Sequence, residues 1–215
     1  MALKNVKSSL REISRSLKAS NASREFLIKN TRDVVILSSH SIIAAHKGDL
    51  KLAKQKIKKA ESVLIKNQKK AKEGFKKYLM TPEQEFVEAH SLLAIIENKE
   101  IPSLKSLRVS KESYVLGLLD CIGELKRLVL DNIRKDRLKE ANRIFTVMEN
   151  LYLVLYPLAM YDKIVKEARR KLDVNRVLVE ETRAVITEEI RRNHFINALA
   201  ENKTSQIFRN AGDGI

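Results

Sequence analysis

Tryptophan is absent from this chain of 215 residues, and cysteine (1), proline (3) and glycine (6) are scarce. Strands usually begin and end at clusters of turn-forming residues, and such clusters are rare here. Long stretches instead repeat Ala, Leu, Ile, Lys and Glu. The sequence therefore predicts an all-α protein, a bundle of about six to seven helices. Its length favours a single domain over residues 1–215, with residues from about 200 onward as a flexible tail.

Several motifs that identify common enzyme classes are also missing. The chain has no G-x-x-x-x-G-K-[ST] loop, no G-x-G-x-x-G turn and no cysteine pair, so nucleotide-dependent and zinc chemistry lack sequence support. Cys121, in the middle of a predicted helix, is expected to be a small packed residue. No apolar run approaches the roughly 20 residues of a membrane span, and no signal peptide is recognisable. We therefore expect a soluble, cytoplasmic protein that uses neither a nucleotide cofactor nor a membrane.

Turn signals divide the chain into predicted helices. Gly48-Asp49 and Thr81-Pro82 are the clearest, because glycine and aspartate favour turns and proline favours the first turn of a helix. Pro157 interrupts the apolar pattern nearer the C-terminus, and the polar residues 20–23 (SNAS) offer a candidate break in the first helix. The predicted helices cover residues 3–46, 49–80, 82–98, 110–134, 136–155 and 159–194.

The formal net charge of +15 is concentrated in the N-terminal part of the chain. Residues 1–80 contain 20 Lys and Arg against 6 Asp and Glu, whereas residues 81–215 contain 22 against 21. Within residues 48–79 the lysines accompany an apolar stripe at helical spacing, which predicts a basic amphipathic helix. Two interpretations are equally open: a solvated face that keeps the protein soluble, or a track for a polyanion. A membrane surface is less favoured because large aromatic residues are few.

Two helical segments each carry a pair of carboxylates. Glu85 and Glu88 are three residues apart, and Asp120 and Glu124 are four apart, so each pair shares one side of its helix. The first pair is unusual because the helix predicted over residues 82–98 is apolar nearly all the way round, as in a helix enclosed by protein. Burying an ionised carboxylate is costly unless it is paired, protonated or bound to a metal. These four acids are therefore the candidate site.

Four carboxylates without histidine or cysteine form a hard oxygen donor set that suits Mg²⁺ or Mn²⁺. Beside a lysine-rich helix, such a set favours metal-assisted cleavage of a phosphodiester. The competing interpretation is that the acids form structural salt bridges with Lys126, Arg127 or Arg143. A di-iron site is not favoured, because Glu88 is followed three positions later by Ser91 rather than His. None of the four histidines, His90 included, is expected to join the site.

The helix predicted over residues 110–134 contains two glycines, Gly117 and Gly123, on the side that carries Asp120 and Glu124. Each glycine inside a helix costs about 1 kcal/mol relative to alanine. We therefore expect another helix or a ligand to approach this side closely.

Two acidic strings in the chain resemble the translin family. They are residues 84–89 (QEFVEA) and residues 114–127 (YVLGLLDCIGELKR), with weaker similarity over residues 24–46 and 161–192. Because all four acids are retained, the chain looks most like translin-associated factor X. This catalytic branch of the family partners translin in a single-strand-specific endoribonuclease. The compact size is similar to that of the prokaryotic and archaeal members.

The resemblance implies a metal-dependent endoribonuclease that cleaves single-stranded RNA, with single-stranded DNA as a further ligand. It implies that Glu85, Glu88 and Asp120 are the catalytic acids and that Glu88 and Glu124 bind Mg²⁺ or Mn²⁺. It also implies a translin-like helical protomer that forms a hollow homo-octamer with the acids facing the lumen. The alternative within the family is a non-catalytic protein that binds single-stranded RNA or DNA.

Four basic residues are predicted to contact RNA. Arg24 and Arg32 follow from the family similarity, whereas Lys76 and Lys77 are chosen because they directly precede the acidic helix. The abundance of lysine and the small number of aromatic residues indicate that phosphate contacts dominate binding and that base stacking is secondary.

Apolar residues on the last helix are predicted to meet another subunit, because a bundle of this size encloses few helices completely. The alternative is packing within the protomer. The residues are Val174, Val177, Leu178, Val185 and Ile186.

Overall fold

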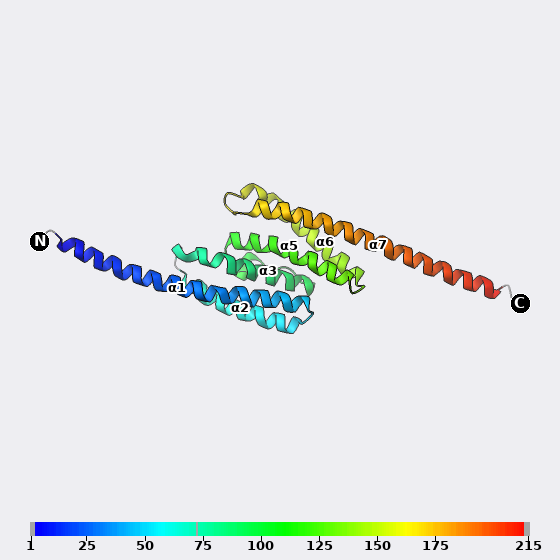
Figure 1. The fold of residues 1–215 in the computed structure, drawn as a ribbon, viewed down its shortest axis with the longest axis horizontal. Helices are drawn as coiled ribbons and strands as arrows, with labels where there is room; N and C mark the ends of the chain where they lie inside the picture. The colour runs from blue at the N-terminus through cyan, green and yellow to red at the C-terminus, as the bar shows by residue number, and fades with distance from the viewer. Residues whose placement is uncertain (1–2, 72, 213–215) are drawn as a thin grey trace. The chain divides into compact units, whose positions relative to one another are not determined.

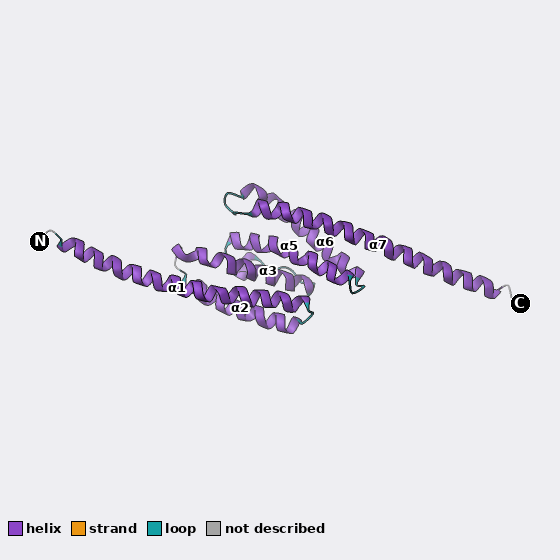
Figure 2. Cartoon of the chain, in the orientation of Figure 1, coloured by secondary structure: helices purple, strands orange, loops and turns teal. Residues whose placement is uncertain are grey.

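The structure, a computed structural model, describes residues 3–71 and 73–212, and it contains no strand in those ranges (Figure 1, Figure 2). The all-α prediction is therefore confirmed. Two compact units are described separately below: Met1–Cys121 with Tyr161–Ala168, and Ile122–Met160 with Arg169–Ile215. The single domain stays a prediction. The elements are α1 (Lys4–His46), α2 (Leu50–Lys70), the 3-10 helix η1 (Glu73–Leu79), α3 (Met80–Ile96), α4 (Leu104–Leu107), α5 (Lys111–Ile133), α6 (Leu138–Leu155), the 3-10 helix η2 (Tyr156–Tyr161) and α7 (Ala168–Gly212).

Most predicted helix boundaries agree with the structure, but the first, the basic and the last helix differ, and the short helix α4 was not predicted. The first helix is continuous through residues 20–23. The basic helix ends at Lys70, where Ala71 adopts an extended backbone and η1 follows in place of further α-helix. The last helix begins at Ala168 rather than at residue 159, after a turn in which Glu167 has a positive φ of 73°. It continues to Gly212, beyond the predicted end, and residues 213–215 lie outside the described residues.

In the first unit, the C-terminal half of α1 packs against α2 and α3 through a seam of buried residues. Several of these residues are small, so the helices approach closely, and Ser41 Oγ donates a hydrogen bond to Ala53 O of α2 at 2.9 Å. The predicted turn is confirmed, since the Asp49 carboxylate caps α2 by accepting from the Leu52 N–H at 2.9 Å. The α1 seam consists of Leu27, Thr31, Val34, Ser38, Ser41 and Ala45.

The α3 helix is enclosed, as its apolar surface on nearly every side predicts. It packs against α1, α2 and η1. Two carboxylates are buried on this helix together with its apolar residues, Glu83 at 5% exposure and Glu88 at 9%. One of them belongs to the predicted site and the other does not. The buried apolar side chains include Phe86, Val87, Ala89, Leu92, Leu93 and Ile95.

In the second unit, ion pairs join α7 to its neighbours. Arg183 of α7 pairs with Glu149 of α6, and Lys126 of α5 pairs with Glu181 of α7. The buried residues of α7 recur every three or four positions along the chain. This interval places them on one face of the helix. In this unit the buried residues of α7 include Leu172, Asn175, Val179, Thr182 and Ile186.

The residues of α7 that were predicted to meet another subunit differ in their exposure to solvent. Ile186 is buried, so the prediction is wrong for this residue, which packs within the unit because it continues the buried face of α7. Val174, Val177 and Val185 are exposed, and Leu178 is half-buried. For these four residues contact with another subunit stays a prediction.

One segment of the described residues, Leu138–Tyr161, is long and apolar enough to cross a membrane by length and composition, in contrast to the expectation from the sequence. A single such helix is weak evidence for a span, because helices of soluble proteins pass the same test. The segment covers α6 and η2, and Leu153, Val154 and Met160 within it are exposed. The second unit therefore presents apolar surface here.

Candidate functional site

The site is built on α3 and the first part of α5, which run in the same direction in the first unit. Ser113 Oγ of α5 donates to Met80 O of α3 at 3.2 Å. One turn further along both helices, Gly117 lies against Gln84 and Val87. Next, the Gln84 side-chain amide donates a hydrogen bond to the Asp120 carboxylate. These contacts move toward the C-terminus of both helices, so α3 and α5 are parallel. Asp120 therefore lies beside the turn of α3 that carries Glu85.

Gly117 is required by this close approach, which the sequence predicts for the side of α5 that carries Gly117 and Gly123. A Cβ atom at Gly117 would lie 2.5 Å from the backbone oxygen of Gln84 and 2.7 Å from Val87 Cβ. Both distances are shorter than van der Waals contact, and backbone cannot move aside cheaply. A Cβ at Gly123 would meet no atom of the described residues within 4 Å. Close approach by a helix is therefore confirmed for Gly117, whereas approach of a ligand at Gly123 stays a prediction.

Gly117→Ala is expected to destabilise the protein by about 1–3 kcal/mol, because the added methyl group forces α3 and α5 apart. Gly123→Ala is the matched control on the same helix. Without a clash it should gain up to about 1 kcal/mol from the higher helix propensity of alanine. Urea unfolding at one protein concentration measures both changes in the free energy of unfolding. Equal shifts for the two variants would show that the close approach at Gly117 contributes nothing.

A second buried carboxylate, which the sequence analysis did not single out, sets this register. Glu83 accepts a hydrogen bond from Gln68 Nε2 of α2 at 2.9 Å and another from the Ser110 N–H, just before α5, also at 2.9 Å. Its charge thus satisfies a free N–H group at the start of α5. Glu83 has a structural role, since it joins α2, α3 and α5. Its position in the first turn of α3 was the available signal.

The structure places the predicted acids on these two helices. Glu88 is buried, and Glu85 and Asp120 are half-buried. Asp120 meets α3 through Gln84, the residue that precedes Glu85. Glu124 is half-buried in the second unit, where its carboxylate lies 3.9 Å from Arg127. The first unit therefore brings Asp120 to the helix that carries Glu85 and Glu88.

Lys126, Arg127 and Arg143, the partners named in the competing interpretation, each bind a carboxylate. Arg127 reaches Glu124 at the long distance of 3.9 Å, and its side chain is more than half exposed, so this pair contributes little. Arg143 pairs with Glu140, at 2.6 Å. That guanidinium group lowers the pKa of Glu140 through its hydrogen bond. Lys126 pairs with Glu181. Two of the three proposed partners thus bind other acids.

No cluster of three or more His, Cys, Asp or Glu side chains close enough to hold a metal ion occurs within residues 3–71 and 73–212. The metal ligands therefore stay a prediction. The donors on α3 and α5 are all carboxylate oxygens, which match the ligand preference of Mg²⁺ and Mn²⁺. Glu88 is the most buried member of the set, at 9% exposure.

His90 lies one turn from Phe86 on α3, and its ring packs edge-on against that phenyl ring with centroids 4.6 Å apart. Burial lowers the pKa of His90, with a smaller opposing effect from the charge of Glu61. A neutral, packed imidazole agrees with the structural role expected for this residue. Cys121 is fully buried, as its predicted packing role requires.

The structure brings Arg24 and η1 together, although they are far apart in the sequence. Arg24 Nε donates to Tyr78 Oη at 3.2 Å, and Lys77 Nζ lies 5.5 Å from the centre of the Tyr78 ring. Lys76 and Lys77 are both exposed. These residues form one basic cluster with an aromatic ring, which we name the Arg24–Tyr78 cluster. Tyr78 was missed because the fold alone places it beside Arg24, although the string FKKY was a signal.

The other basic features are exposed but more widely spread. Arg32 lies on the exposed side of α1, two turns beyond Arg24. The amphipathic prediction for α2 is confirmed within Leu50–Lys70, since Ala53, Ile57 and Leu64 are buried while most of its lysines are exposed. The first unit thus presents basic side chains from α1, α2 and η1.

Solved structures share this fold. The crystal structure of AfC3PO and a structure of AfC3PO in complex with duplex RNA each match with a TM-score of 0.79 and 30% identity. They cover 86% of this chain and 98% and 97% of those chains. The crystal structure of apo-NeC3PO matches with a TM-score of 0.75 over 84% of this chain and 96% of that chain. Its identity of 22% shows the fold alone.

Sequence comparison gives the family. An uncharacterized protein of Methanocaldococcus jannaschii is 39% identical over 168 residues, which cover 74% of this chain and 72% of that protein. A profile described as Translin family matches residues 5–186, which include α3, α5 and the Arg24–Tyr78 cluster. The chain belongs to the translin family.

Proposed function

We propose that this protein is a metal-dependent endoribonuclease of the catalytic, translin-associated factor X type. The observation that carries the proposal is the packing of α5 on α3. Gly117 permits it, and it holds the Asp120 carboxylate against the turn of α3 that bears Glu85, one turn before the buried Glu88. The donors that these acids offer are all carboxylate oxygens, which suit a divalent cation such as Mg²⁺ or Mn²⁺.

The family resemblance implies the two proposed metal ligands, Glu88 and Glu124, and their helix spacing agrees with it. Glu88 follows Gln84 by four residues on α3, and Glu124 follows Asp120 by four residues on α5. Residues four apart lie on one face of a helix. Each proposed ligand therefore lies one turn beyond a partner of the Gln84–Asp120 hydrogen bond. This spacing supports Glu88 and Glu124 as ligands of Mg²⁺ or Mn²⁺.

The remaining acids are assigned to proton transfer and positioning. When bound, a divalent ion polarises a phosphoryl oxygen and favours deprotonation of the attacking water. Glu85 and Asp120 are the carboxylates that we assign to orient this water and accept its proton. Gln84 holds Asp120 in place by donating a hydrogen bond to one of its oxygens.

RNA is proposed to bind through its phosphates at the basic side chains of the first unit. The Arg24–Tyr78 cluster supplies Arg24, Lys76 and Lys77, and Arg32 lies further along α1. The complex of AfC3PO with duplex RNA supports RNA as the ligand class. Single-stranded RNA is the proposed substrate, because a flexible strand adapts to enclosed carboxylates more readily than a rigid duplex.

We also propose homo-oligomeric assembly, an octamer in the form that the family resemblance implies. Exposed Val174, Val177 and Val185 on α7 support a contact with another subunit. Light scattering at micromolar protein should give a mass near eight times 24.6 kDa. A monomeric mass would contradict the assembly.

The proposed activity is tested with an end-labelled oligoribonucleotide, supplied as a single strand and as a duplex. Purified protein should cut the single strand internally with Mg²⁺ or Mn²⁺, and EDTA should stop the reaction. Intact RNA that stays bound in all these conditions would identify the non-catalytic, translin-like alternative.

A further inference from the structure

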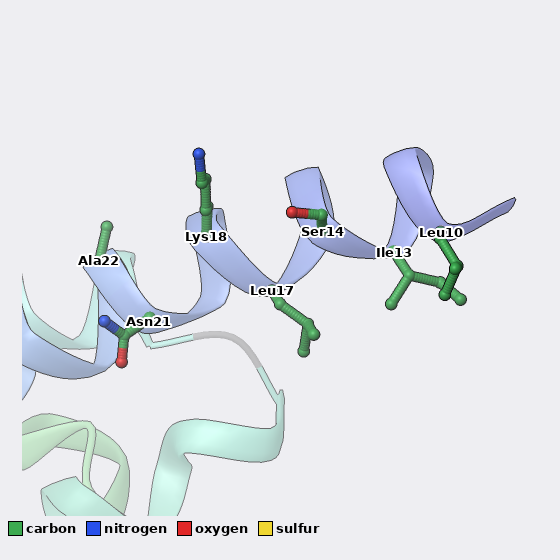
Figure 3. A pocket seen from close by; sticks show the side chains of 7 residues that line it. All are labelled: Leu10, Ile13, Ser14, Leu17, Lys18, Asn21 and Ala22. Atoms are coloured by element: carbon green, nitrogen blue, oxygen red, sulfur yellow. The ribbon is translucent and has the colours of Figure 1, made fainter. Parts of the chain in front are cut away.

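The N-terminal part of α1 carries an apolar seam that is exposed in the first unit. Figure 1 shows α1 extending past α2 and α3 at this end. In Figure 3, Leu10, Ile13 and Leu17 point to one side of the helix and Lys18 points to the other. These three apolar residues line an open hollow. Five apolar side chains of the seam are 49–63% exposed: Leu3, Val6, Leu10, Ile13 and Leu17.

The exposed seam continues the buried seam of the same helix in one seven-residue repeat. Alternating steps of three and four lead from Leu3 through Leu17, Ser20 and Arg24 to Leu27, and then along the buried residues to Ala45. In coiled-coil notation, Leu3, Leu10 and Leu17 occupy a positions, and Val6 and Ile13 occupy d positions. The C-terminal half uses this repeat to pack against other helices. The N-terminal half has the same pattern for a partner helix.

The shape of the seam favours a helix over a lipid surface as that partner. Only two positions in seven are apolar, whereas helices that lie on membranes need a wider apolar face, usually with aromatic residues. No aromatic residue occurs before Phe26. The flanking e and g positions are mostly small and polar, which allows a second helix to approach. They are Lys7, Ser14 and Asn21 at e, and Ser9, Ser16 and Ser23 at g.

We propose that residues 3–20 of α1 pair in parallel and in register with the same residues of a second copy of this chain. In such a pair each e position faces the preceding g position of the partner, so Ser14 meets Ser9 and Asn21 meets Ser16. The segment is basic, but Lys4, Arg11 and Lys18 occupy b positions away from the seam. Like charges therefore do not oppose pairing of identical segments until Arg24, where the exposed seam ends.

The pairing is about 27 Å long, since 18 residues rise 1.5 Å each. In this pair Leu3, Val6, Leu10, Ile13 and Leu17 each pack against the same residue of the second copy. The segment is therefore complementary to itself. The contact is separate from the acids on α3 and α5. The test of the α1 pairing is therefore independent of the proposed nuclease activity.

Cysteine cross-linking tests the pairing directly in the full-length protein. A disulfide requires Cα atoms within about 7 Å, so Leu10→Cys at an a position should cross-link about tenfold faster under mild oxidation than Ser8→Cys at the outward f position. The natural Cys121 is fully buried and serves both variants as the same background. Equal or absent cross-linking of the two variants would overturn the proposal.

A second measurement covers the case in which cysteine perturbs the seam. The Leu10→Asp/Leu17→Asp double variant should show a lower mass than wild type by light scattering, while Ser8→Asp/Arg15→Asp on the outward face should not. Cleavage of RNA, measured on the same samples, reports separately on the acid site. A double variant that keeps the wild-type mass and loses binding to anionic phospholipid vesicles would show that the exposed seam binds a membrane surface. That result would overturn the pairing.

Discussion

Glu88→Gln is expected to lower the rate of RNA cleavage by about 10²-fold or more. Glutamine has the size of glutamate but no charge, so the substitution removes the buried carboxylate that is proposed to bind the metal. Because the substitution keeps the size of a side chain buried at 9% exposure and changes none of the basic residues proposed to bind phosphate, RNA affinity and assembly should change little. Single-turnover cleavage in Mg²⁺, alongside RNA binding in EDTA, separates these effects.

The matched control is Glu97→Gln, the same chemical change at the C-terminal end of the same helix. Lys54 and Lys99 bind the Glu97 carboxylate, and their hydrogen bonds lower its pKa. Losing such a surface interaction should leave cleavage near the wild-type rate. If Glu88→Gln cleaves as fast as Glu97→Gln, the metal site has been placed on the wrong residues.

The affinity for single-stranded RNA is expected to fall roughly a thousandfold between 50 and 200 mM salt, the loss expected for about six phosphate contacts. The physical reason is the release of counterions from the RNA when lysine and arginine neutralise its phosphates. The excess of positive charge in residues 1–80 and the exposed lysines of α2 and η1 support this mode of binding. Fluorescence anisotropy over a series of salt concentrations measures the slope.

Replacing both Lys76 and Lys77 by alanine should reduce that slope by roughly one to two contacts. Lys135, an exposed lysine of the second unit, supplies the control substitution. Tyr78→Phe removes the hydroxyl that accepts from Arg24 but keeps the ring, so it should weaken binding less than the two lysine changes. An affinity that hardly changes with salt would contradict phosphate-dominated binding.

Local signals predicted much of the fold because they act within a few residues. Asp49 caps α2, and the apolar residues around Phe86 and Leu92 identify α3 as enclosed. The change from α2 to η1 was missed because the lysines on either side of Ala71 favour helix equally well. Similarly, α4 spans only four residues, which is too short for an apolar period to show.

The candidate site was only partly visible in the sequence. Paired acids and helical glycines can be read from spacing, and Gly117 does mark a close approach. The partners of Asp120 and Arg24 could not be predicted, because Gln84 and Tyr78 lie 36 and 54 positions away along the chain. Such contacts depend on how α3, α5, α1 and η1 pack. The role of Glu83 as a cap for α5 is a property of the same packing.

The central claim, that carboxylates on α3 and α5 bind the catalytic metal, is tested most directly by Mn²⁺ binding in the absence of RNA. Electron paramagnetic resonance of free Mn²⁺ during a titration measures the bound ion. Wild type and Glu97→Gln should bind Mn²⁺ alike, while Glu88→Gln and Glu124→Gln should each weaken binding by about 10-fold or more. Equal Mn²⁺ binding by all four proteins would contradict the claim.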